Sequence, residues 1–205
     1  FKFKASDLPE ILTRWSARYT VFVPSGSPDN VQMRIWSRRT RKEARFMEPD
    51  EYTNLSVAPK GFVFGEREEL FRWEGSEKTC TAVSAPSSSS LQEEDKILFG
   101  LRPCDTYGLA YMDRFFLGEH HDINYHLRRQ HVFIVAVNCL NAGPECYCAS
   151  MGTGPFAEII AHTEYGMQAG KGYDLLLTPD YGPGHKKGEK GENDWYWVEA
   201  GSDRG

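Results

Sequence analysis

Long hydrophobic runs are missing from this 205-residue sequence. The longest apolar stretch, Val132 to Val137, is far shorter than the roughly 20 apolar residues that a membrane-spanning helix needs. No apolar segment opens the chain in the manner of a signal peptide. We therefore expect a cytoplasmic protein without a membrane span.

A glycine-rich phosphate loop is also missing. The nearest candidate, the Gly-Thr-Gly-Pro segment at 152–155, lacks the third glycine of the dinucleotide-binding fingerprint and follows no strand that leads cleanly into a helix. Binding of flavin or nicotinamide by this chain is therefore not expected.

An excess of positive charge is absent as well, because 24 Lys and Arg residues stand against 29 Asp and Glu residues, for a net charge of −5. A nucleic-acid interface normally has an overall basic balance with interleaved aromatic residues, and only Trp36 accompanies the one basic stretch. We expect no nucleic-acid partner and assign the stretch to a solvated face or to docking of an acidic partner subunit. Its members are Arg34, Arg38, Arg39, Arg41, Lys42 and Arg45.

Cysteine is scarce, with five in the chain, and the odd number leaves one thiol over in any full set of disulfides. Cys139, Cys146 and Cys148 nevertheless fall within ten residues of one another. In a reducing compartment such crowding indicates metal binding or catalysis. Cys80 lies in a polar stretch and is taken as uninvolved. Together with Cys104, the three crowded cysteines match the four thiolates of a tetrahedral zinc site or of a [4Fe-4S] cluster.

The cysteines also allow two other interpretations. Cys104 taken alone fits a buried structural thiol. A nucleophilic cysteine could pair with His120, His121 or His126, but the sequence contains no local Cys/His signature of such a catalytic pair. We therefore assign no catalytic residue.

Short apolar runs bounded by turn residues predict one domain over 1–205 with an α+β, mixed α/β fold. Its central sheet has mostly short strands and flanking helices, with the cysteine-rich loops at strand ends. The predicted strands are 19–24, 31–36, 97–101, 132–137, 174–178 and 195–199. The predicted helices begin at Ser6, span 66–73, and follow Asp105 as a cap. The loops at 84–94 and 179–194 are expected to be flexible.

The placement of the cysteines bears on the kind of site. Cys104 and Cys139 each follow an apolar strand, so both are expected at one end of the sheet. Alternating residues of an extended Cys-x-Cys segment point to opposite faces, so both thiolates reach one zinc ion only if the backbone bends, whereas a cubane offers separated iron corners. This spacing favours a cluster over zinc without excluding zinc.

The sequence resembles the N-terminal region of the iron–sulfur subunits of the sulfhydrogenase β and anaerobic sulfite reductase A family. The resemblance runs over nearly the whole chain and rests on the order and separation of several short motifs between residues 58 and 148. The motifs are Ala-Pro-Lys-Gly-Phe-Val-Phe at 58–64, Glu-Arg-Glu-Glu-Leu-Phe at 66–71, Phe-Gly-Leu-Arg-Pro-Cys-Asp at 99–105, 122–125 with Arg128-Arg129, Asn138-Cys139, and Cys146-Tyr147-Cys148.

The resemblance implies that Cys104, Cys139, Cys146 and Cys148 ligate one [4Fe-4S] cluster. In that family the subunit relays electrons between a flavin-bearing subunit and a catalytic partner, and a ferredoxin-like module with two further clusters follows the N-terminal region. The C-x₂-C-x₂-C-x₃-C-P run of such a module is missing here, and the chain begins at Phe1. We therefore expect a fragment of a longer subunit.

The sequence thus predicts an electron-transfer segment rather than a catalytic subunit. It would belong to a cytosolic, anaerobic redox complex of the hydrogenase, sulfite reductase or disulfide reductase type, with flavin-bearing and catalytic subunits and ferredoxin-like clusters as partners. The alternative is a structural zinc-binding domain that serves as an assembly module.

Overall fold

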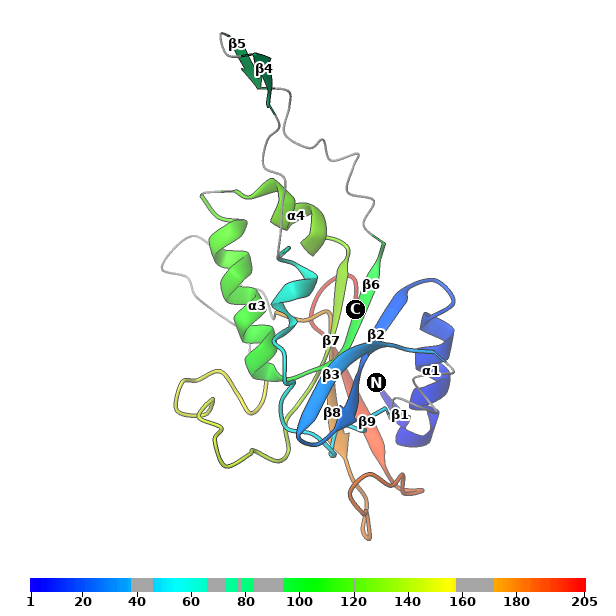
Figure 1. Ribbon diagram of the computed structural model, residues 1–205. Coiled ribbons are helices and arrows are strands. Elements are labelled where there is room, and N and C mark those ends of the chain that lie inside the picture. The colour runs from blue at the N-terminus through cyan, green and yellow to red at the C-terminus, as the bar shows by residue number, and fades with distance from the viewer. Residues whose placement is uncertain (38–45, 66–72, 77–78, 83–93, 120, 158–171) are drawn as a thin grey trace.

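The computed structural model describes residues 1–37, 46–65, 73–76, 79–82, 94–119, 121–157 and 172–205. Its main feature is a seven-stranded mixed sheet with the strand order β1-β9-β8-β7-β6-β2-β3 (Figure 1). The strands are β1 (Lys2–Lys4), β2 (Thr20–Ser27), β3 (Asn30–Ile35), β6 (Lys96–Leu101), β7 (Val132–Val137), β8 (Leu175–Asp180) and β9 (Trp195–Ala200). The predicted mixed α/β fold with a central short-stranded sheet is confirmed.

The described helices are few and short. They are the α-helices α1 (Leu8–Trp15), α3 (Pro103–Phe116) and α4 (Ile123–Arg129), and the 3₁₀ turns η1 (Ala5–Asp7) and η2 (Pro59–Phe62). A separate two-stranded sheet pairs β4 (Trp73–Ser76) with β5 (Thr79–Ala82), and Cys80 lies on β5. No helix in the described part of the chain combines the length and the apolar content that crossing a bilayer requires.

The centre of the large sheet is parallel. Strands β2, β6, β7 and β8 run in the same direction, while β1, β9 and β3 pair antiparallel at the two sides. Parallel strands are covered on both faces and so are apolar along their whole length, as β7 is with its Val-Phe-Ile-Val-Ala-Val sequence. The carboxyl ends of β6 and β7 consequently meet at one edge of the sheet.

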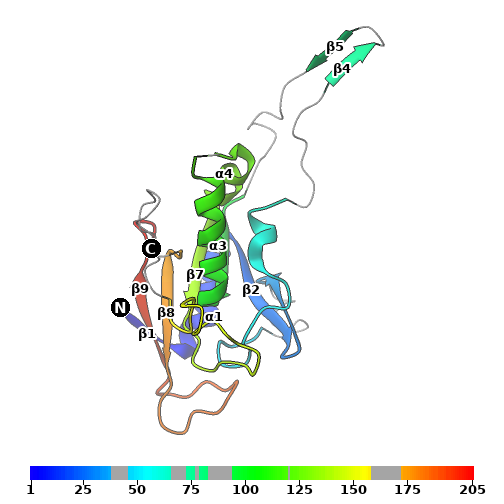
Figure 2. The same ribbon diagram turned by 90° about the vertical axis from the view of Figure 1, so that its left-hand side faces the viewer.

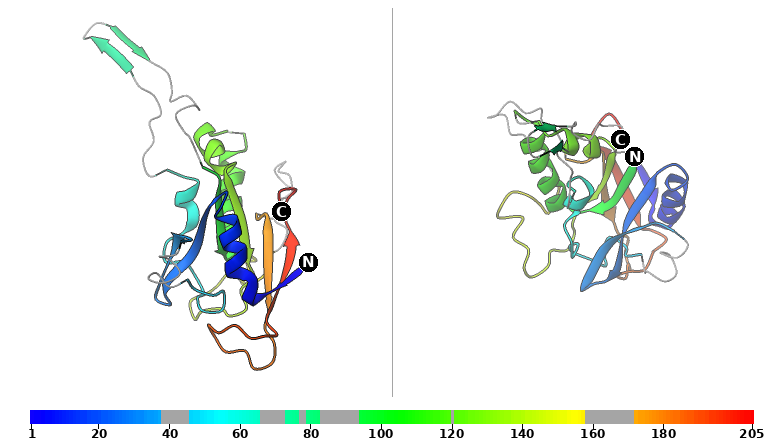
Figure 3. Two further views of the ribbon diagram at one scale, coloured as in Figure 1. Left: turned by 90° about the vertical axis from the view of Figure 1, so that its right-hand side faces the viewer. Right: turned by 45° about the horizontal axis from the view of Figure 1, so that its top comes forward.

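Helices cover both faces of the sheet (Figures 2 and 3). On one face, Leu8 and Leu12 of α1 pack in a core with Ile97 and Phe99 of β6. On the other face, α3 and α4 contribute to a second core that includes Leu98 and Leu101 of β6, together with Leu109, Tyr125, Ile134 and Leu176. The two cores together hold the carboxyl edge of the sheet in place.

Gly100 interrupts the regular alternation of β6. The pairing with β7 shifts by one residue between Phe99 and Leu101, and Gly100 has a φ of +85°. The bulge explains why Leu101 shares a core with Leu98 rather than with Phe99. It lies two residues before Arg102, at the entrance to α3.

Replacement of Gly100 by Ala is expected to lower the free energy of unfolding by about 2–4 kcal/mol, because a left-handed φ and overpacking both add a cost. A Cβ at this position would lie 2.6 Å from the Tyr52 hydroxyl and 2.8 Å from Cγ of Pro24. Urea denaturation measures the effect. Gly61→Ala is the control, since its Cβ would meet nothing within 4 Å; equal losses in the two variants would contradict this explanation.

Two helix starts differ from those predicted. Helix α1 begins at Leu8 after the 3₁₀ turn, with Asp7 rather than Ser6 at its N-cap position. Helix α3 begins at Pro103, whose fixed φ suits the first turn of a helix. Asp105 is therefore the third residue of α3 rather than its cap, and its carboxylate accepts a hydrogen bond from the Arg102 main-chain N–H at 3.2 Å. Cys104 thus lies inside the first turn.

Some predicted segments lie outside the residues that the structure describes. Most of the helix over 66–73, most of the loop at 84–94, and the arginines at 38–45 lie outside them. Helix α4 and strand β1 are described elements that the sequence patterns did not predict. In the loop at 179–194, the first two residues extend strand β8 to Asp180.

Candidate functional site: a cavity lined by four cysteines

The four predicted ligands come from three separate segments that meet at the carboxyl edge of the sheet. Cys104 is in the first turn of α3, just after β6, and Cys139 is two residues beyond the end of β7. Cys146 and Cys148 belong to the loop that follows Cys139, which lies near the N-terminal end of α3 (Figure 2). Parallel pairing of β6 with β7 places the first two cysteines on neighbouring strand ends.

All four cysteines line one cavity of about 460 Å³. Each of the four thiols is free and partly exposed. Since one water molecule occupies about 30 Å³ in the liquid, the cavity has room for a cofactor of several atoms. Its wall also contains Asn54, Leu55, Arg102, Asp105, Glu145, Met151 and Pro155.

The loop after β7 is closed by its own hydrogen bonds. The Cys139 N–H donates to the Pro155 carbonyl at 3.1 Å, and the Thr153 N–H donates to the Cys148 carbonyl at 2.9 Å. A further bond, from the Cys146 N–H to the Gly143 carbonyl at 3.1 Å, forms the turn that bends the chain before Cys-x-Cys. The loop therefore folds back and returns its cysteines to the strand end from which it started.

Two of the four thiols, those of Cys104 and Cys139, lie where burial disfavours the thiolate form. Burial raises the pKa of Cys104 to about 11, and the charges of Asp105 and Cys148 add to this effect. Burial also raises the pKa of Cys139, while the nearby Arg102 acts in the opposite direction. Without a metal these two thiols hold their protons at neutral pH, so metal binding has to release them.

Arg102 lines the cavity, although the sequence patterns assigned it no role. Its guanidinium donates to the carbonyl oxygens of Pro49, Tyr52 and Thr53, which attach the loop at 46–56 to the cavity wall. From that loop, the Asn54 side chain lies 3.9 Å from the Cys146 sulfur. An arginine directly after an apolar strand is the signal in the sequence that could have drawn attention to it.

The residues that line the cavity fit an iron–sulfur cluster in donor type and donor number. Four thiols line the cavity, and no histidine is found among its described lining residues. Within the described ranges, no group of three or more His, Cys, Asp or Glu side chains is arranged so as to hold a metal ion. The structure thus brings the four cysteines around one cavity, while ligation itself stays a prediction.

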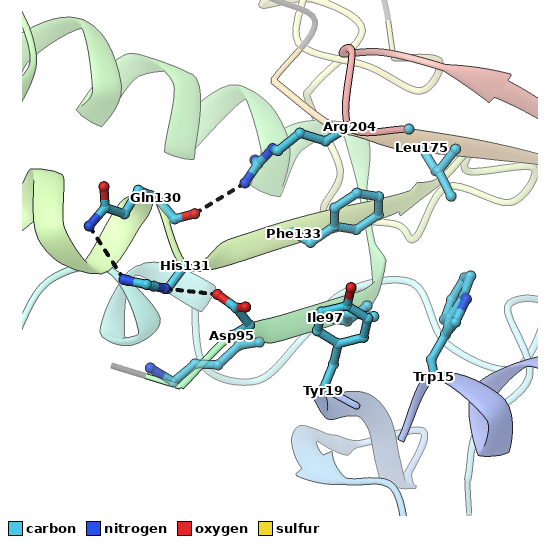
Figure 4. Close-up of a pocket in the computed structure, with 11 residues that line it drawn as sticks. Trp15, Tyr19, Asp95, Ile97, Gln130, His131, Phe133, Leu175 and Arg204 are labelled. Atoms are coloured by element: carbon cyan, nitrogen blue, oxygen red, sulfur yellow. Dashed lines mark hydrogen bonds and ion pairs between the residues drawn. The ribbon is translucent and has the colours of Figure 1, made fainter. Parts of the chain in front are cut away.

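A second cavity, of about 540 Å³, lies at the opposite edge of the sheet (Figure 4). Trp15, Tyr19 and Phe133 contribute aromatic rings to its wall. At its polar end, the imidazole of His131 lies 2.8 Å from the Asp95 carboxylate. None of the four cysteines lines this cavity.

The loop between β8 and β9 is attached to the segment at 46–56 by His185. The imidazole lies 2.7 Å from the Asp194 carboxylate and 3.0 Å from the Asp50 carboxylate, and both acids are buried. Tyr181 stacks on the ring at 3.9 Å. Burial disfavours the imidazolium, but the hydrogen bonds and charges of Asp194 and Asp50 outweigh it and raise the pKa of His185.

This arrangement predicts a pH-dependent stability. Because the folded pKa of His185 is raised above 6.5, its contribution is complete below about pH 6.5 and is lost as the pH rises through the folded value. Relative to His185→Gln, the wild type is expected to be more stable by about 1–2 kcal/mol at about pH 5.5, and the gap should narrow by about pH 8.5. Urea denaturation at the two pH values measures the gap, and a gap that widened toward high pH would contradict this assignment.

Comparison with known proteins shows a partial likeness to a sulfhydrogenase subunit. Over 103 residues the chain is 30% identical to the sulfhydrogenase 2 subunit beta of Pyrococcus furiosus, which covers 50% of this chain and 28% of that subunit. This chain thus matches less than a third of that relative's length. No protein-family model and no solved structure matches. The match supports a related subunit family over half of the chain, and the quoted motifs lie between residues 58 and 148.

Proposed function

We propose that this chain is an electron-relay segment of a hydrogenase-type redox complex and that it holds one [4Fe-4S] cluster through Cys104, Cys139, Cys146 and Cys148. The observation that carries the proposal is the convergence of four thiols, from three segments of the chain, on one cavity. The partial likeness to a sulfhydrogenase beta subunit supports the class of complex.

A cluster in this cavity would accept one electron at a time and pass it on without making or breaking bonds to a substrate. The residues of this chain would supply the thiolate ligands and limit the access of water. Main-chain groups of Cys104 and Asp105, in the first turn of α3, form hydrogen bonds with the Cys104 sulfur, and hydrogen bonds to sulfur tune the potential of such a centre. The polypeptide would therefore set the potential and the position of the centre.

The proposed partners are a flavin-bearing subunit as one electron carrier, a catalytic subunit, and ferredoxin-like clusters. The complex would work in the cytoplasm. The name of the relative, a beta subunit, supports assembly with other subunits.

Anaerobic purification of the full chain tests the proposal. The expected result is a coloured protein with about four iron and four labile sulfide per chain, the content of one cubane. A colourless protein with one zinc per chain and no labile sulfide would overturn it in favour of the structural zinc domain. Chemical reconstitution with iron and sulfide, followed by the same measurements, covers loss of the cluster during purification.

A further inference from the structure

Arg102 is a buried cation in the wall of the four-cysteine cavity. Only 2% of the residue is exposed, and it lines the cavity together with all four cysteines. It is the residue directly before the first turn of α3, two positions from Cys104. A guanidinium keeps its charge at every accessible pH, so this position carries a permanent positive charge.

The hydrogen-bond partners of the guanidinium are neutral, although its charge also attracts the nearby Asp105 carboxylate. They are the carbonyl oxygens of Pro49, Tyr52 and Thr53, and the guanidinium also lies over the face of the Tyr52 ring, whose centroid lies 4.1 Å from Cζ. Among the residues that the structure describes, no carboxylate forms an ion pair with this guanidinium. The carboxylate of Asp105 instead accepts a hydrogen bond from the Arg102 main-chain N–H.

Carbonyl dipoles offset the cost of burying the charge, but they do not cancel the charge itself. In a medium of low dielectric constant a positive charge acts over several ångströms with little screening. A thiolate-ligated cluster becomes more negative by one charge when it takes up an electron. A fixed cation in the cavity wall therefore stabilises the reduced state more than the oxidised state.

We infer that Arg102 raises the reduction potential of the cluster in this cavity through its buried charge, in addition to positioning the loop at 46–56. The inference rests on the proposed function. A purely positioning residue would be needed for stability alone, whereas a charge-setting residue also changes the potential. The two roles can be separated because lysine retains the charge and glutamine does not.

The test is spectroelectrochemical titration of the anaerobically purified full chain. Arg102→Gln is expected to shift the midpoint potential to a more negative value, while Arg102→Lys stays close to the wild type. Both variants are expected to lower the melting temperature, since neither side chain reaches all three carbonyl oxygens. Arg14→Gln is the matched control: it removes one positive charge from a side chain that is 77% exposed, and no shift is expected.

If Arg102→Gln does not retain its cluster, Asp105→Asn provides a second test of how charges in the cavity wall affect the midpoint potential. Asn keeps an acceptor for the Arg102 main-chain N–H and removes a negative charge from the cavity wall, so the potential is expected to become more positive. Absence of iron in the wild type would overturn the proposed function and the inference together. A loaded cluster whose potential is the same in Arg102→Gln and the wild type, or shifts equally in the Gln and Lys variants, or does not rise in Asp105→Asn, would overturn the inference alone.

Discussion

Cys148→Ser and Cys104→Ser are each expected to lose most of the iron and labile sulfide that the wild-type chain holds after anaerobic purification. Changes in the residues around metal ligands already cost about 10–100-fold in affinity, and loss of a direct ligand is expected to cost at least as much. Iron and sulfide analysis of the purified variants, together with their visible absorption, measures the loss.

The two substitutions test different parts of the cavity wall. Cys104 is held by helix α3, whereas Cys148 lies in the loop. Its sulfur is so close to Gly154 that a Cβ added to this glycine would lie 3.2 Å from it. If both belong to one site, either substitution should remove the whole cluster rather than a share of it. Retention of full iron content in one of the variants would remove that cysteine from the ligand set.

Cys80→Ser is the matched control, because it makes the same chemical change on β5, in the separate two-stranded sheet. Its iron content is expected to equal that of the wild type. An equal loss in Cys80→Ser and Cys148→Ser would show that the ligand set was chosen wrongly.

Phe99→Ala is expected to have the largest effect on stability, a loss of about 3–5 kcal/mol in the free energy of unfolding. Phe99 is fully buried on β6, and its ring packs 6.3 Å from the ring of Phe46. Truncation leaves a cavity between α1 and the sheet, directly before the bulge that leads to Arg102. A domain of this size is stable by only about 5–15 kcal/mol, so the loss is a large share of the total.

Urea denaturation of the metal-free chain measures this change without interference from a cofactor. Phe115→Ala is the control, because Phe115 lies on α3 with 64% of its surface exposed, and a loss below about 1 kcal/mol is expected. Similar losses in the two variants would show that burial on β6 does not determine the effect.

The central strands could be predicted from sequence because their patterns are local. Strand β7 has the predicted bounds, 132 and 137, and β6 begins one residue before the predicted Ile97. A parallel strand that is buried on both faces needs a run of apolar residues, and such a run is visible without knowledge of its neighbours. The late strands β8 and β9 also match their predicted bounds within two residues at each end. Strand β8 is a further apolar run, whereas β9 pairs antiparallel and is recognised by its aromatic residues.

The surroundings of the cysteines could be predicted only in part. Cys104 and Cys139 could be assigned to strand ends, because each follows an apolar run. The attachment of the loop at 46–56 could not be foreseen, since Arg102 reaches carbonyl groups about 50 residues away and any residue can offer a carbonyl. His185 likewise depends on Asp50, 135 residues distant, and no periodicity marks such a contact.

The extra residue in β6, Gly100, affects how the strand bends rather than which core its side chains face. Ile97 and Phe99 face one core and Leu98 the other, and Leu101, after the extra residue at 100, lies on the side of Leu98. Deleting Gly100 would join Phe99 directly to Leu101, and strict alternation would still place Leu101 on the side of Leu98, opposite Ala136 of β7. Arg102 would then leave the strand from the same side as before. A single-residue deletion here would thus remove the bend that the bulge gives the strand, without reversing the segment that leads to Cys104.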